Sequence, residues 1–560
     1  MKALEELRQE WATCVVQDPT ELGELPWRMP NDTCWLWFVS RVAAIMHRSV
    51  VVIHGPKGCG WGPGEFFTMF HSTGPPYPTA ARIFTTDMQR DDVVFGASEK
   101  LEKTIIEAYE TVRSYPMFPE DTGKPPEMVF VFAACAADLI GEDIQLAAQR
   151  VMKKIPVKVV AVKAGGYRYR AFCLTDERTD YWSLYEAIFN NLIEPPKVKK
   201  EYSVNILGEH NPWRLEIEEL KWPLRMLGID INCVFTAEAT LEDIQHAAEA
   251  NLNALKCEST VLKLAELMKE KYDIPYYSIE MSPLGLGVMN DWVMGIASFF
   301  GKEKQARELC AELTARSEAR IAEAKKFLKG RKVSICSGIS HPMAMYRYCA
   351  ELGMNPVILR ISGGWGKRTE RIKQIAAQHG LEPPVMIVRD RMKEETIREV
   401  FNTLQPELLI GGSPVPLKGG KGQERVYHGS FGAGVAGQSG VGNPIDLQAV
   451  IARSEVIQEY QPCLLTLMEY EEPWYGFNGA VKFVRDIGRG IGLPEGTVEL
   501  PPEIDLIREV VYTPQHMVWR YQPKASQRYS PDHPVWDFAQ RAYGSRNPDE
   551  IRIRLEKKDK

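Results

Sequence analysis

The sequence predicts an α/β protein made of three doubly wound parallel-sheet domains. Two observations predict this class. Short apolar runs without strict alternation recur along the chain, as expected for strands that are covered on both faces. Helical patterns separate these runs, which is the rhythm of βαβ units. The chain has 560 residues, of which 44% are hydrophobic, and is therefore long enough to build several buried cores.

The expected elements follow in order along the chain. Candidate strands span residues 49–53, 128–133, 157–162, 203–207, 231–236, 333–337, 356–361, 384–389, 407–410 and 463–468. The longest helical patterns cover residues 241–256, 258–272 and 303–328. Each helix lies between two candidate strands or just before one, as a parallel sheet requires.

Composition shifts divide the chain into segments. The expected order is an N-terminal segment, three α/β domains and a C-terminal extension, with bounds at 1–29, 30–200, 201–328, 329–495 and 496–560. A run rich in proline and lysine, 194–200, is the expected linker between the first two domains. Proline and charged residues dominate the extension, which we expect to pack either on its own chain or on a partner subunit.

A glycine-rich loop, 411–442, follows the candidate strand 407–410. A loop of this length inside a compact domain is more often functional than accidental, although disorder is the alternative. No GxxxxGK[ST] phosphate-binding loop occurs in the sequence. If a nucleotide drives this protein, another subunit is expected to bind it.

Charge and hydropathy exclude several classes of function. The net charge of −6 arises from 68 basic and 74 acidic residues without a long basic run, so no nucleic-acid partner is expected. No stretch of about 18 apolar residues predicts a membrane span. The first residues lack the apolar core of a secretion signal, which predicts a cytoplasmic protein. Eleven cysteines in such a chain suggest metal ligands or buried thiols rather than disulfides.

Three cysteines carry the strongest chemical signal. Cys59 and Cys135 each lie just after a candidate strand, in a loop that contains glycine, and Cys34 precedes them. Open α/β sheets bind ligands at the carboxyl ends of their strands. Soft thiolates gathered at such a place suit iron–sulfur chemistry.

The motifs around these cysteines resemble those of the nitrogenase component 1 superfamily. They are His54-Gly-Pro-Lys-Gly-Cys-Gly60, Thr85-Thr-Asp-Met88, Asp91-Asp-Val-Val-Phe-Gly96, Cys135-x5-Gly-Glu-Asp-Ile144, Asn205-Ile-Leu-Gly-Glu-His-Asn211, Gly228-Ile-Asp230 and Tyr475-Gly-Phe-Asn-Gly479. The resemblance covers about residues 30–490 and implies three domains around a central metallocluster cleft. It also implies that Cys34, Cys59 and Cys135 hold half of a P-cluster of the 8Fe-7S type.

The same resemblance implies partners. A β-type subunit would supply the remaining P-cluster ligands in an α2β2 heterotetramer, and a separate ATP-binding iron protein would deliver electrons. The match is closer to α-type chains because of Cys257 at the end of the segment 250–257. In α-type chains a cysteine at this place binds one end of a large nitrogenase-type iron–sulfur cofactor. Without the family, Cys257 is a cysteine on an amphipathic helix, where a buried small hydrophobe is the usual role. The sequence does not fix the heterometal or an organic acid of that cofactor.

Departures from true nitrogenase appear around the expected cofactor. No histidine occurs in 463–473, the pocket histidine is missing from 164–173, and the arginine of the third domain is replaced within 337–342. A site that protonates dinitrogen needs positioned proton donors, so we expect no nitrogen fixation. His428, in the glycine-rich loop, is the candidate second ligand of the cofactor, and a solvated loop histidine is the alternative.

Retained cluster cysteines together with the lost histidine are most similar to methylthio-alkane reductase, a nitrogenase-like branch of the superfamily. This resemblance implies ATP-driven reductive cleavage of C–S bonds in small alkyl thioethers. Tyr167 and His341 are the candidate catalytic residues, as pocket walls or proton donors, and ordinary packing is their alternative role. Three other functions stay open: a dinitrogen-reducing α chain, a cofactor-assembly scaffold, and a tetrapyrrole reductase. Cys257 argues against the last of these.

Overall fold

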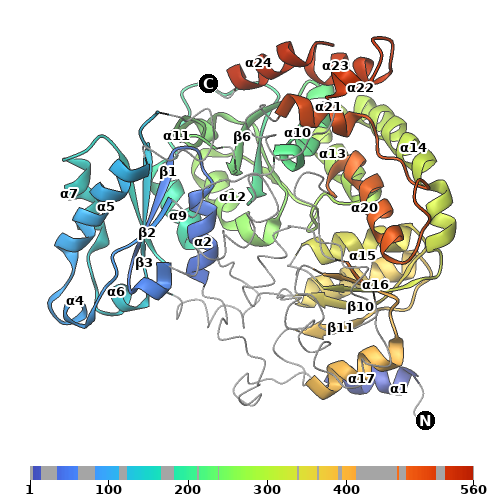
Figure 1. The fold of residues 1–560 in the computed structure, drawn as a ribbon, viewed down its shortest axis with the longest axis horizontal. Coiled ribbons are helices and arrows are strands. Elements are labelled where there is room, and N and C mark those ends of the chain that lie inside the picture. The colour runs from blue at the N-terminus through green and yellow to red at the C-terminus, as the bar shows by residue number, and fades with distance from the viewer. Residues whose placement is uncertain are drawn as a thin grey trace.

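The computed structural model describes most of the chain. The described residues are 4–13, 35–60, 82–112, 123–165, 182–210, 214–237, 239–336, 340–361, 365–388, 394–411, 463–465, 474–511 and 524–558. Three separate parallel sheets organise these residues, one after another along the chain (Figure 1).

The first sheet has the strand order β2-β1-β3-β4. Its strands are β1 (Ser49–His54), β2 (Ile83–Thr85), β3 (Met128–Ala133) and β4 (Lys158–Lys163). The flanking helices are α2 (Trp35–Ala44), α4 (Arg90–Phe95), α5 (Ser98–Val112), α6 (Cys135–Leu139), α7 (Ile144–Met152) and α9 (Trp182–Asn191). Alternate β1 residues enter different cores: Val51 packs with α2 and α9, whereas Val52 packs with α5 and α7. Both faces are therefore covered, which explains the continuous apolar runs.

The second sheet has the order β6-β5-β7-β8. Its strands are β5 (Ser203–Glu209), β6 (Asp230–Thr236), β7 (Leu252–Leu255) and β8 (Tyr276–Tyr277). The helical elements of this region are α10 (Arg214–Met226), α11 (Leu241–Gln245), the 3-10 helix η5 (His246–Glu249), α12 (Glu258–Tyr272), α13 (Leu286–Phe299) and α14 (Glu303–Leu328).

The third sheet has the order β11-β10-β9-β12-β13. Its strands are β9 (Lys332–Cys336), β10 (Asn355–Ile361), β11 (Val385–Val388), β12 (Leu408–Gly411) and β13 (Cys463–Leu465). The helices are α15 (His341–Glu351), α16 (Trp365–Gln378) and α17 (Glu394–Leu404). The N-terminal helix α1 (Leu4–Thr13) returns to this sheet, where Trp11 joins the core formed by β10, β11 and α17.

The C-terminal helices fold back on their own chain. They are α20 (Gly476–Gly490), α21 (Glu503–Val511), α22 (Ala525–Arg528), α23 (Val535–Tyr543) and α24 (Pro548–Lys558). Phe538 packs edge-on against Trp222 of α10 with ring centroids 5.1 Å apart, and Arg541 forms an ion pair with Glu312 of α14. Figure 1 shows this red tail above α10. The described part of the extension is thus an integral part of the subunit.

The predicted class, α/β with three parallel sheets, is confirmed, and each candidate strand coincides with an observed strand. Helices 258–272 and 303–328 are α12 and α14 to the residue. The predicted helix 241–256 is wrong: it divides into α11, η5 and β7. Local helix propensity favoured one helix, but β7 pairs with β5, with Leu252 opposite Val204, and tertiary pairing overrides propensity.

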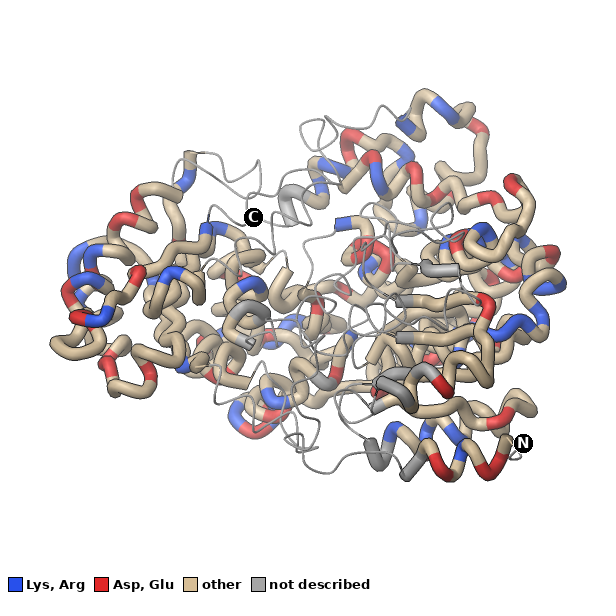
Figure 2. Tube along the Cα trace, turned by 60° about the horizontal axis from the view of Figure 1, so that its bottom comes forward, with Lys and Arg blue, Asp and Glu red and all other residues tan. Residues whose placement is uncertain are grey.

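Two further features concern the surface and the limits of the described chain. Lysine and arginine alternate with acidic residues along the outer helices, as Figure 2 shows. None of the described helices combines the length and the hydropathy needed to cross a bilayer. Beyond Gly411, the predicted glycine-rich loop lies outside the described residues, as do residues 466–468 of the last candidate strand.

Candidate functional site

Two neighbouring strands of the first sheet bring Cys59 and Cys135 together. β1 and β3 pair in parallel, with His54 opposite Ala133, so both strands end at the same edge. Beyond β1 the chain turns at Gly55 into one helical turn that contains Cys59, and beyond β3 α6 begins at Cys135. Both thiols are free and partly exposed. Burial raises the pKa of Cys59, and the neighbouring Cys135 raises it further.

Glycine at position 55 makes the close approach of these two turns possible. A Cβ atom on Gly55 would lie 2.4 Å from the Cβ atom of Ala134, which is too short for two carbon atoms. The Ala134 N–H donates to the carbonyl of His54 at 2.9 Å and fixes one turn on the other. The glycine of the His-Gly-Pro motif is therefore required by packing.

A buried histidine supports the same edge. His54 Nδ1 lies 3.1 Å from Thr86 Oγ1, and His54 Nε2 lies 3.9 Å from Glu142 Oε2. Burial lowers the pKa of His54, and the Glu142 carboxylate opposes that effect. Glu142 also accepts a hydrogen bond from the backbone N–H of Ala97. Side chains from three of the sequence motifs thus connect the turns that follow β1, β2 and β3.

Cys59 and Cys135 form only part of a ligand set. Cys34 lies outside the described residues, one position before α2 begins. Within the described ranges, no three His, Cys, Asp or Glu side chains gather as a complete metal site. Paired, partly exposed thiols fit an iron–sulfur cluster in their chemistry, and their number fits a cluster that is completed by further cysteines.

Cys257 lies at the corresponding edge of the second sheet. It follows β7 and is the residue before α12, so the prediction that it lies on an amphipathic helix is wrong. The side chain is 6% exposed. Gly208 at the end of β5, with φ of +98°, lies against it: a Cβ atom there would be 2.8 Å from Cys257 N. Cys257 Sγ lies 3.1 Å from Ser340 Oγ, which belongs to the third α/β region.

A buried charge network adjoins Cys257. Lys256, 2% exposed, forms ion pairs with Glu209 at 2.6 Å and with Glu216, and its Nζ lies 4.2 Å from the centroid of the Tyr475 ring. Burial alone would lower the pKa of Lys256, but the two carboxylates raise it. Burial raises the pKa of Glu216 to about 8, Glu209 adds to the rise, and Lys256 opposes it. Lys256 is thus held between two buried carboxylates, which balance its positive charge within the network.

Two neutral imidazoles flank this network. His341, the first residue of α15, contacts the Tyr475 ring edge-on with ring centroids 5.8 Å apart. His210 Nε2 lies 2.8 Å from Thr260 Oγ1. Burial and the nearby Lys256 hold the pKa of both histidines well below its ordinary value. Both rings are thus neutral at pH 7 and can donate an N–H hydrogen bond from one nitrogen only.

The sequence-predicted residues divide into three groups. The structure brings Cys59 and Cys135 together, and it places Cys257 and His341 around the network of Lys256. Tyr167 and His428 lie outside the described residues. Sequence reasoning missed the network itself. Its signal was a lysine next to the candidate cysteine and a glutamate at the end of an apolar strand, two charges that burial forces to pair.

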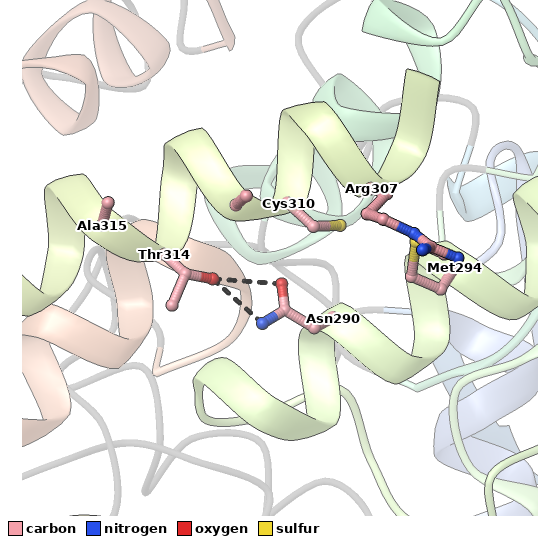
Figure 3. Close-up of a pocket in the computed structure, with 7 residues that line it drawn as sticks. Asn290, Met294, Arg307, Cys310, Thr314 and Ala315 are labelled. Carbon is pink, nitrogen blue, oxygen red and sulfur yellow. Dashed lines mark hydrogen bonds between the residues drawn. The ribbon is translucent and has the colours of Figure 1, made fainter. Parts of the chain in front are cut away.

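One groove among the described residues lies away from both candidate sites. It lies between α13 and α14 and has a volume of about 460 Å³ (Figure 3). Its lining consists of Asn290, Met294, Arg307, Cys310, Ala311, Thr314 and Ala315. Asn290 and Thr314 hydrogen-bond each other, which leaves a mostly apolar surface. None of the candidate site residues lines this groove.

The fold and the paired thiols define a class: an α/β protein that carries cysteine thiols at the carboxyl ends of parallel strands. Comparison with known proteins identifies the family. The model of the nitrogenase component 1 type oxidoreductases matches residues 34–418. The chain therefore belongs to that family, whose members are oxidoreductases that bind iron–sulfur clusters.

Individual relatives lie at moderate distance. The chain is 26% identical to the nitrogenase molybdenum-iron protein alpha chain of Clostridium pasteurianum, over 81% of this chain and 84% of that protein. It is 29% identical to the nitrogenase iron-molybdenum cofactor biosynthesis protein NifE of a Nostoc species, over 64% of this chain and 70% of that one. The solved structure "Nitrogenase Cp1 at pH 6.5" superimposes with a TM-score of 0.60 at 20% identity, covers 83% of this chain and 90% of its own, and shows the shared fold.

Replacement of Gly55 by alanine tests the cysteine pair. The new methyl group collides with Ala134, and we expect a loss of about 1–3 kcal/mol of stability from overpacking. The two turns must separate, so less iron binds per subunit after anaerobic purification. Gly58→Ala is the matched control in the same turn, since no atom lies within 4 Å of its Cβ position. Equal iron content in the two variants would contradict this account.

Replacement of Gly208 by alanine tests whether the close packing of Gly208 positions Cys257. The methyl group meets the backbone of Cys257, and the left-handed backbone adds strain of about 1–3 kcal/mol. We expect the ligand to shift and the spectroscopic signal of a Cys257-bound cluster to weaken. Gly228→Ala is the control, because that glycine also has a positive φ but its Cβ position meets only Lys302 Nζ, at 3.5 Å. If the signal is preserved in Gly208→Ala but lost in Gly228→Ala, the close packing of Gly208 does not position Cys257.

Proposed function

We propose that this chain is the catalytic α-type subunit of a nitrogenase-like reductase that cleaves C–S bonds of small alkyl thioethers, as in methylthio-alkane reductase. One observation carries the proposal. Cys257 lies buried where the second and third α/β regions meet, and Lys256 beside it is paired with two carboxylates. Such a site suits a soft metal cofactor and an uncharged substrate.

The proposal includes two metal groups. Cys34, Cys59 and Cys135 would hold half of a P-cluster of the 8Fe-7S type, and Cys257 would hold a large nitrogenase-type iron–sulfur cofactor, with His428 as the candidate second ligand. When bound, the cofactor would supply low-potential electrons to the substrate. Gly55 and Gly208 give each thiolate its place, and the thiolates are the ligands that iron–sulfur groups require.

The surroundings of Cys257 favour a neutral substrate. A thioether carries no charge, and Lys256 has no unpaired charge to offer because Glu209 and Glu216 pair with it. His341 is a neutral imidazole, which can direct one N–H at a substrate sulfur atom. Tyr167 is the second candidate pocket residue. An anionic substrate would need an unbalanced cation, and Lys256 does not provide one.

The reaction is a balanced two-electron reduction. Two electrons and two protons convert the C–S bond into a thiol and a C–H bond, so a methyl thioether gives methanethiol and a hydrocarbon fragment. Electrons would come one at a time from an ATP-binding iron protein. The chain has no phosphate-binding loop of its own, and ATP is therefore expected to bind to the partner.

An exposed apolar patch supports the partner proposal. We name it the α4–α6 patch: Val94 and Phe95 of α4 are 66% and 85% exposed, and Leu139 and Ile140 lie exposed at the end of α6. α6 begins at Cys135, and Figure 1 shows α4 and α6 at the same end of the first sheet. Contiguous exposed apolar side chains mark interaction sites. A partner that docks there would be close to the cluster cysteines.

The β-type subunit has a different role. It would cover the partly exposed Cys59 and Cys135 and complete the cluster, which gives an α2β2 heterotetramer. Two alternative functions deserve a direct test, because relatives of comparable identity include both a nitrogenase alpha chain and a cofactor biosynthesis protein. They are a dinitrogen-reducing α chain and a cofactor-assembly scaffold.

Activity separates the three functions. The complex is purified anaerobically with its iron protein and supplied with ATP, and dimethyl sulfide, 2-(methylthio)ethanol and dinitrogen are offered separately. We expect methanethiol and a hydrocarbon from the thioethers and no ammonia. Ammonia would support the nitrogenase alternative. A complex that holds its cofactor without turnover, and transfers it to an acceptor protein, would support the scaffold.

Substitutions that introduce a negative charge into the α4–α6 patch test the proposed docking site. Phe95→Asp and Val94→Asp place a carboxylate in the proposed apolar interface, and we expect the iron-protein concentration for half-maximal rate to rise about 10-fold or more. Val198→Asp is the matched control, because Val198 is 70% exposed and belongs to neither α4 nor α6. Cluster spectra should be unchanged in all three variants. Equal kinetics in Val94→Asp and Val198→Asp would exclude this patch.

A further inference from the structure

The hydroxyl of Ser340 lies against the sulfur of Cys257. Ser340 Oγ is 3.1 Å from Cys257 Sγ and 2.9 Å from the hydroxyl oxygen of Ser282. All three side chains are buried. They come from three different places: the end of β7, the residue before α15, and the connection between β8 and α13. The hydroxyls of Ser282 and Ser340 therefore form a hydrogen-bonded chain that ends at the sulfur of Cys257, the candidate ligand.

Ser340 does not do what a serine at its position usually does. It is the N-cap residue of α15, where a serine side chain commonly accepts a hydrogen bond from the second or third N–H of the helix. Here the side chain forms no capping bond. Its hydroxyl is directed at Cys257 and Ser282 instead. The helix α15 therefore lacks a side-chain capping hydrogen bond, and the Ser340 hydroxyl is placed to interact with Cys257 instead.

We propose that Ser340 is a positioning residue that donates a hydrogen bond to the Cys257 thiolate and raises the reduction potential of the iron–sulfur group bound there, with Ser282 orienting the Ser340 hydroxyl. This inference rests on the proposed function, because it takes Cys257 as the cofactor ligand.

The direction of the hydrogen bond follows from the protonation of the ligand. In the free thiol either atom can be the donor. A metal-bound thiolate has no proton, so the Ser340 hydroxyl must donate and its oxygen is then open to the Ser282 hydroxyl. Successive hydrogen bonds polarise one another in a dry interior. A donor on the sulfur withdraws electron density, which stabilises the reduced state of the cluster.

Three serine-to-alanine variants test the proposal in the full complex. Ser340→Ala removes the donor on the sulfur, and Ser282→Ala removes only the group behind it. Ser334→Ala is the control: Ser334 lies on β9, is buried, and its hydroxyl has no hydrogen-bond partner among the described residues. The measurements are iron content, the electron paramagnetic resonance signal, and the midpoint potential of the Cys257-dependent cluster by redox titration.

The expected order of effects is specific. Ser340→Ala keeps its iron and shifts the midpoint potential to more negative values, Ser282→Ala shifts it less in the same direction, and Ser334→Ala leaves it unchanged. An unchanged potential in Ser340→Ala with full iron content overturns the proposal, and so does a shift of the same size in Ser334→Ala. If Ser340→Ala does not fold, an unchanged potential in Ser282→Ala overturns it.

A fourth variant separates this inference from the proposed function. Cys257→Ala should abolish the signal that is titrated. If the signal persists in Cys257→Ala, the proposed cofactor site is wrong and the Ser340 proposal falls with it. If the signal depends on Cys257 but its midpoint potential is unchanged in Ser340→Ala, only the Ser340 proposal fails. Thioether turnover is not needed for either decision.

Discussion

The close approach of a glycine to the neighbouring turn is the constraint on which both candidate sites depend. Gly55 allows the turn after β1 to lie against Ala134 beside Cys135, and Gly208 allows the end of β5 to lie against Cys257. In each case two parallel strands end side by side, and a single methyl group would separate them. The positions of these cysteines are thus constrained by backbone contact, and rigid backbone is what a precise binding site needs.

Charge balance is the second constraint. Lys256 is buried beside the cysteine that we assign to the cofactor, and a buried ammonium group is unfavourable unless carboxylates accompany it. Glu209 of β5 and Glu216 of α10 are these carboxylates. The ring of Tyr475, the residue before α20, lies over the Lys256 ammonium group. The network therefore joins three segments that are distant in sequence and balances the positive charge of Lys256 beside Cys257.

The sequence predicted the strands well and the short elements poorly. The apolar runs of β1 and β3 are unambiguous because both faces of each strand are buried. Local pattern predicts a helix at β7, since its four residues follow an alanine-rich stretch and only pairing with β5 makes them a strand. Cys59, Cys135 and Cys257 could be found from motifs, but the contacts of Lys256, Glu216 and Ser340 could not, because they join residues that are distant in sequence.

By itself, the sequence determined the α/β class and the place of Cys59 and Cys135 after a strand. These features are local: they depend on apolar runs, glycine positions and residue type within a few positions of one another. Only the tertiary structure decided that Cys257 leaves a strand, that a serine hydroxyl from the third region lies on its sulfur, and that the adjacent lysine is neutralised. Such contacts depend on how whole sheets pack, and no spacing along the chain records them.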